Sequence, residues 1–171
     1  QTFSIQYKHF GKKTPLQISR AIYGANPFPE SIAIADYIRS HSSENDKIAV
    51  IGSEPQICFY SNRKAATGYL YTYALMENHP FALKMQHDMI REIEQVQPRF
   101  LVYVQVHTSW LVRPESPRHI FEWFGQYHQE RYVPVGCADI LSADSTHYVW
   151  GSDAAMYAPQ SNYWVAVFER K

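Results

Sequence analysis

The sequence predicts an α/β fold: a three-layer sandwich with a mostly parallel, Rossmann-like sheet and an antiparallel carboxyl-terminal extension. Helical and β-branched segments alternate through the first part of the chain, which is typical of parallel strands joined by helices. Three strand-like segments then follow one another without a helix between them. The chain has 171 residues and is 46% hydrophobic, which suits a single core. We therefore expect right-handed crossovers between the first strands.

The amino-terminal residues 1–22 show no clear period, and we expect a linker or edge segment there before a single domain at residues 23–171. Apolar residues at helical spacing, with prolines near the first turn or just after the last, predict three helices. These helices lie over residues 29–41, 79–97 and 117–129.

The strand-like segments are short, apolar and bounded by polar residues or glycine. The two that alternate with helices, at residues 47–52 and 99–106, are expected to be buried parallel strands. The antiparallel extension is assigned to residues 132–141, 147–150 and 163–168. Two segments leave alternatives open: residues 56–60 fit a strand or a short helix, and residues 65–76 fit an irregular segment or a short helix.

Charge and composition exclude several classes of function. Lys and Arg number 16 and Asp and Glu number 16, without a basic stripe, so nucleic acid is not expected as the main partner. No apolar stretch of this sequence is long enough to span a membrane. Cys58 and Cys137 are expected to be buried thiols, although the sequence leaves their pairing open.

Motifs for catalysis or cofactor binding are missing from the sequence. The glycines do not follow a dinucleotide or P-loop pattern, and Glu54 stands where a phosphate would otherwise bind, so no cofactor is expected. The histidines do not form a metal-binding motif, and no Ser lies in a nucleophile elbow. We therefore assign no catalytic residue and no metal ligand.

Polar residues that follow the two parallel strands form the candidate site. Glu54 comes directly after the first strand, where α/β folds place their sites, and Arg63 is predicted to lie beside it. The pair could form a pocket for a sugar or phosphate with Arg63 as the anion-binding fork, or a structural ion pair that fixes the loop. Aromatic rings nearby suit either a sugar face or core packing. The candidate substrate-binding set is Ser53, Glu54, Arg63, Tyr69, Ser109 and Trp110.

The run from Asp46 to Thr67 resembles a group of membrane glycosyltransferases. Its strand, its Gly-Ser-Glu-Pro turn and the segment around Arg63 are similar to those of the dolichyl-phosphate-mannose protein mannosyltransferases and the bacterial lipid A aminoarabinose transferases. The segments Asn26–Phe28, Gln97–Val102 and Ser109–Trp110 fit the same pattern. The resemblance covers about residues 23–110.

The resemblance implies a parent enzyme that moves a sugar from a polyprenyl-phosphate donor onto a lipid or protein acceptor. In that group, many membrane helices precede a soluble domain outside the cytoplasm. This chain would be that accessory domain, on the periplasmic side of a bacterial inner membrane. Its partners would be the membrane-embedded part of the same chain and, through it, the donor or the acceptor glycolipid or protein. A first residue of Gln1 rather than Met fits a processed chain or a fragment.

The group's catalytic acidic residue lies in the membrane part, and no position here corresponds to it. The domain would then cover the membrane active site or help to position donor or acceptor. Two alternatives remain. One is an independent soluble α/β enzyme acting on a nucleotide or sugar through Glu54, Arg63 and Ser109. The other is a protein-interaction module that uses the tyrosine-rich segment 69–73.

Overall fold

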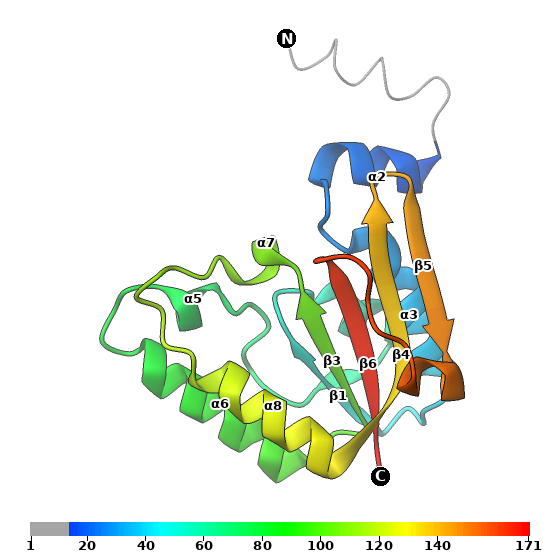
Figure 1. The fold of residues 1–171 in the computed structure, drawn as a ribbon. Coiled ribbons are helices and arrows are strands. Elements are labelled where there is room, and N and C mark those ends of the chain that lie inside the picture. Colours follow the sequence, from blue (N-terminus) through cyan, green and yellow to red (C-terminus); the bar gives the residue numbers. More distant parts are fainter. Residues whose placement is uncertain (1–13) are drawn as a thin grey trace, which may run out of the picture.

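A computed structural model describes residues 14–171 and confirms the α/β fold, with a six-stranded sheet between two helical layers (Figure 1). The strands lie in the order β2-β1-β3-β6-β4-β5. Their bounds are β1 Lys47–Ile51, β2 Lys64–Ala65, β3 Phe100–Gln105, β4 Tyr132–Ser142, β5 Ser145–Trp150 and β6 Trp164–Arg170.

The sheet is parallel at one end and antiparallel over the rest. Strand β1 pairs in parallel with β2 and with β3, and helices make the connections between them. From β3 onward, each neighbouring pair is antiparallel: β3 with β6, β6 with β4, and β4 with β5. The predicted antiparallel extension is therefore present, and it joins the parallel part through the last strand of the chain, β6.

Helices cover both faces of the sheet (Figure 1). Their bounds are α2 Pro15–Tyr23, α3 Phe28–Ser40, α4 Gln56–Ser61, α5 Tyr73–Met76, α6 Ala82–Val96, α7 His107–Trp110 and α8 His119–Arg131, with a 3-10 helix η1 at Gly151–Ala155. The three helices predicted from apolar spacing correspond to α3, α6 and α8. Of the open alternatives, residues 56–60 belong to a short helix, and residues 65–76 include the end of β2 and the short helix α5.

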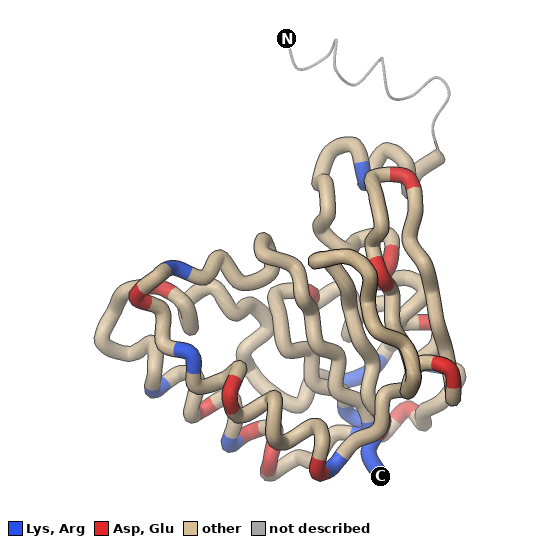
Figure 2. Tube along the Cα trace, viewed as in Figure 1, with Lys and Arg blue, Asp and Glu red and all other residues tan. Residues whose placement is uncertain are grey.

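Two cores lie on opposite faces of the sheet because successive strand residues point to opposite sides. In β3, Leu101 belongs to the core beneath α6 and α8, which also contains Met89 and Phe124. The next residue, Val102, belongs to the core beneath α3, together with Ile38. Lys, Arg, Asp and Glu are frequent along α6 and lie toward the two ends of α8, whereas the middle of β3 and β6 carries none (Figure 2).

Helix α2 corrects the expectation of a linker or edge segment for residues 15–22. The Thr14 hydroxyl accepts from the backbone of Gln17, and the Gln17 side chain accepts from the backbone of Thr14, which is a reciprocal capping box with Pro15 in the first turn. The capping box and the amphipathic spacing of residues 15–23 are the two signals that the expectation missed. Residues 1–13, the rest of that prediction, lie outside the described residues.

Within residues 14–171, none of the helices combines the length and apolar character needed to cross a bilayer. The same residues contain no group of three or more His, Cys, Asp and Glu side chains placed to hold a metal ion. Cys137 is buried and Cys58 half-buried, and both are free thiols. Burial raises the pKa of Cys58 to about 11 and that of Cys137 to about 12.

Candidate functional site

The carboxyl ends of β1 and β3 lie side by side at one end of the sheet, which we call its carboxyl edge, and the opposite end is its amino edge. Three buried hydroxyl residues connect the two strands at the carboxyl edge. The backbone N–H of Ser53 donates to Ser109 Oγ over 2.7 Å. Thr72 donates from its backbone N–H to Ser53 Oγ over 2.9 Å and from its hydroxyl to the Ser109 carbonyl over 3.0 Å. The structure thus brings together Ser53 and Ser109, two of the predicted site residues, through a third that the sequence analysis missed.

Gly52 makes this close approach possible. Its φ is +148°, and a Cβ atom at this position would lie 2.7 Å from Val104 Cβ and 2.8 Å from Ser109 Oγ. Real Cβ atoms do not approach neighbours so closely, so a side chain here would push the end of β1 away from β3 and from the residues that follow β3. The glycine that ends the predicted strand therefore serves packing between neighbouring strands rather than phosphate binding.

Glu54 lies beside this hydroxyl cluster and is only 4% exposed. The Gln56 side-chain amide donates to Glu54 Oε2 and also to Ser31 Oγ, the latter over 3.1 Å, which connects the turn to α3. Burial raises the pKa of the Glu54 carboxyl, and hydrogen bonds from Gln56 and Ser109 oppose this shift in part.

The predicted pairing of Glu54 with Arg63 is wrong. Lys64, the next residue, pairs with Lys47 at the amino end of β1, so Arg63 lies at the opposite edge of the sheet from Glu54. Helix α4 carries the chain back from one edge to the other. The nine-residue separation that suggested proximity is therefore spanned by a full crossing of the sheet.

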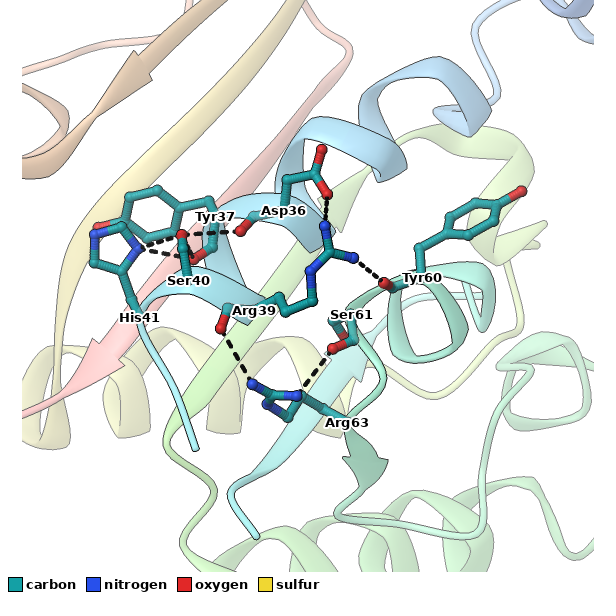
Figure 3. A network of polar contacts seen from close by, with 8 residues as sticks. All are labelled: Asp36, Tyr37, Arg39, Ser40, His41, Tyr60, Ser61 and Arg63. Atoms are coloured by element: carbon teal, nitrogen blue, oxygen red, sulfur yellow. Dashed lines mark hydrogen bonds and ion pairs between the residues drawn. The ribbon is translucent and has the colours of Figure 1, made fainter. Parts of the chain in front are cut away.

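Arg63 is a clamp between the end of α3 and the end of α4, as Figure 3 shows in part. A guanidinium carries five N–H donors, and here all of them are used within the chain. The acceptors are Ser42 Oγ at 2.8 Å and the carbonyls of Ser61 at 3.1 Å, Asn62 at 3.0 Å, Arg39 at 3.1 Å and Ser42 at 2.8 Å. No donor is left to bind a phosphate, so the anion-fork hypothesis for this residue is also wrong.

The aromatic members of the predicted site are packing residues. Trp110 is 4% exposed, its indole N–H donates to the Val104 carbonyl over 2.8 Å, and its ring packs against Phe121 with centroids 4.7 Å apart. Tyr69 is half-buried against the same core. The core-packing alternative therefore describes Trp110, whose ring is closed to a sugar. The more exposed ring of this segment is that of Tyr71, which stacks on Tyr73 at 6.0 Å.

Two other buried carboxylates escaped the sequence analysis. Glu30 is 1% exposed and forms an ion pair with Arg20 of α2. Asp139 is fully buried in β4. The sequence does signal Asp139, because it is a single charge inside an apolar run. Glu30 gives no such signal, because it follows Pro29 in the first turn of a helix, where the helix dipole favours carboxylates in general.

None of the protein-family models, curated proteins or solved structures compared with this chain matches it. What the carboxyl edge can do chemically follows from its contacts. Ser109 Oγ accepts from a backbone N–H, and its neighbours are other hydroxyls and the acid Glu54 rather than a histidine. The hydrogen bonds of Ser109 therefore join the two strands, and they do not include the histidine partner of a Ser-His pair.

Proposed function

We propose that this chain is an accessory, extracytoplasmic domain of a membrane glycosyltransferase that uses a polyprenyl-phosphate-sugar donor. It acts on the periplasmic side of a bacterial inner membrane by covering the membrane-embedded active site. One observation carries the accessory role. The run Asp46–Thr67, on which the resemblance rests, folds as the continuous unit β1, turn, α4 and β2, and both of its distinctive charged residues are bonded inside the domain.

The internal use of these side chains favours a supporting role over chemistry. Glu54 holds Gln56 and the turn at the carboxyl edge, and Arg63 holds the ends of α3 and α4 at the amino edge. A residue that binds an anion needs donors that are not already paired, and Arg63 has none left. The motif is therefore explained as a fold-stabilising unit, and the sugar-transfer chemistry is assigned to the membrane part.

The surface that would face the membrane part is the carboxyl edge around α5 and α7, which pack against each other. Leu70, Tyr71 and Leu111 are each about half exposed there, at 45%, 58% and 48%. Helix α2 lies at this same edge of the sheet in Figure 1, and the hydrogen bond from Thr108 to Asn26 joins α7 to the segment after α2. A membrane region that precedes the domain, as the resemblance implies, would attach on this side.

The test uses the full-length gene product in membranes. We expect its upstream sequence to contain several membrane spans, and we expect the triple variant Leu70→Ser, Tyr71→Ser, Leu111→Ser to lose about tenfold in sugar transfer, or ~1.4 kcal/mol of stabilisation. The matched control is Phe59→Ser with Met156→Ser, which removes more exposed apolar side chains, at 79% and 91%, from other surfaces.

Equal activity in the triple variant and the control would contradict the proposal, as would an upstream sequence without membrane spans. Turnover of a nucleotide or sugar by the 171-residue chain alone would instead support the independent enzyme. Circular dichroism of each variant domain distinguishes a lost contact from a lost fold.

A further inference from the structure

A hollow lies between α2, the start of α3 and the turn that joins β4 to β5. Its volume is about 190 Å³. At about 30 Å³ for each water molecule, this space holds roughly six waters or one small polar molecule. Its polar lining residues are Gln17, Arg20, Glu30, Asp144, Ser145, Thr146 and Tyr148.

Glu30 contributes an acceptor without a donor to this hollow. One carboxylate oxygen, Oε1, accepts from Arg20 and from the Thr146 hydroxyl. The other, Oε2, is buried and has no hydrogen-bond partner among the described residues, the one such side-chain atom found there. Buried polar atoms are almost always paired in folded proteins. Among the described residues this oxygen is an unsatisfied acceptor, and a donor that reached it from the hollow would pair it.

Tyr148 forms an aromatic wall of the hollow, and its ring is fixed by stacking on other aromatic rings. It is 37% exposed, and its ring stacks on Trp150 with centroids 6.2 Å apart and planes 17° apart. Trp150 in turn stacks on Tyr37 of α3 at 4.7 Å and 11°. Trp150 lies so close over Gly136 that a Cβ atom there would be 2.4 Å from the ring. This column fixes the orientation of the Tyr148 ring before any ligand binds.

The charged side chains that line the hollow are of both signs, Arg20 against Glu30 and Asp144. The Arg20 guanidinium is 9% exposed and lies in the wall beside Glu30, so an ammonium group at Glu30 would also meet a buried positive charge. A hydroxyl group can donate to Glu30 without that repulsion. Gln17 and Thr146 add further polar groups around the same space.

We propose that this hollow binds a single pyranose ring, with one hydroxyl donating to Glu30 Oε2 and the apolar face of the ring against Tyr148. A rigid aromatic face combined with a few fixed polar groups is the composition that selects a sugar ring from water. The site is separate from the α5–α7 surface. Sugar binding by this chain and sugar transfer by the full-length enzyme are therefore different measurements, and either can fail alone.

The experiment is an NMR titration of the 171-residue chain with methyl α-glucoside, methyl α-mannoside and glucosamine. Each is added up to about 50 mM, well above a dissociation constant of ~1 mM. We expect saturable shifts of the Glu30, Thr146 and Tyr148 amides with at least one methyl glycoside. Tyr148→Leu should bind that glycoside about tenfold more weakly. Tyr163→Leu is the matched control, because Tyr163 is 42% exposed but lies outside the hollow.

Glu30→Gln supplies the second variant, since it keeps the side-chain size and removes the charged acceptor. Its thermal unfolding is recorded in parallel because the change also removes the ion pair with Arg20. A folded Glu30→Gln protein without sugar binding supports the proposal. Absence of saturable shifts with either methyl glycoside, or equal binding by the two tyrosine variants, would overturn it. Tighter binding of glucosamine than of the glycosides would also overturn it, in favour of an ammonium ligand.

Discussion

Glu54 and Asp139 are two buried carboxylates at the same edge of one sheet, and their pKa values are shifted in opposite directions. Glu54 follows β1 in the parallel half. Asp139 lies in β4 of the antiparallel half, opposite Trp164, which in turn pairs with Gln105 at the carboxyl end of β3. Burial raises the pKa of Glu54, whereas the pKa of Asp139 is held below its usual range.

The difference lies in the donors. Burial alone would raise the pKa of Asp139 as well, but hydrogen bonds from Ser161, Gln160 and Tyr157 outweigh it. Two of these donors are backbone N–H groups, and the Tyr157 hydroxyl donates over 2.8 Å. Glu54 has only side-chain donors. The comparison teaches that donor number and type decide whether a buried acid keeps its charge. The charged form of Asp139 therefore holds the loop before β6. Glu54 contributes less to stability through its hydrogen bond with Gln56.

The largest expected effect follows from removing the Asp139 charge. Asp139→Asn should lower the free energy of unfolding by about 3 kcal/mol, because charge-assisted bonds to a buried acceptor are lost and an amide group meets donors. Urea unfolding at neutral pH measures the loss. Asp153→Asn, an exposed acid beside the same loop, should change stability by less than about 0.5 kcal/mol. Similar losses in the two variants would break the comparison.

Gly52→Ala should produce the next largest effect, a loss of about 2 kcal/mol, because the new Cβ collides with Val104 and Ser109. The collision would also loosen the hydroxyl cluster beside Glu54. Gly68→Ala is the control, since a Cβ there has no neighbour within 4 Å. Equal unfolding midpoints in urea for the two variants would show that the close approach at Gly52 does not matter to stability.

Glu54→Gln should cost less than about 1 kcal/mol at neutral pH. The amide has the shape of the protonated acid, and a raised pKa means that the folded chain disfavours the charged form that the substitution removes. A loss as large as that of Asp139→Asn would show that Glu54 is a charged anchor too, and the contrast between the two acids would disappear.

The smallest effects concern pH. Because the folded pKa of Asp139 is depressed, its stabilisation is present above the unfolded value of about 3.9 and is lost as the pH falls through the folded value. For Glu54 the sign is reversed: its contribution is present below about 4.3 and is lost as the pH rises through the raised value. Unfolding free energies between acid and neutral pH should therefore have a shallower acid slope in Asp139→Asn, whereas Glu54→Gln should retain it.

The sequence predicted the layers of the fold because helical spacing and β-branched runs are local signals. Ser53 and Ser109, which it placed in one candidate set because each follows a predicted strand, lie together because neighbouring parallel strands end together. The sequence misplaced Arg63 because it put this residue a short turn after Glu54, whereas α4 carries the chain back to the amino end of β1 before Arg63 is reached. The contact of Glu30 with Thr146 joins residues 116 positions apart, which no local pattern encodes.

The position of β6 has a consequence for biosynthesis. This strand is the last of the six in the chain, yet it lies between β3 and β4 and pairs with both. During translation, the parallel half and the β4–β5 hairpin leave the ribosome as two pieces with unpaired edges, and they can join only after residues 164–170 have emerged. Chaperones that shield open strand edges would therefore act on this domain late in its synthesis, after most of its hydrophobic residues are already exposed.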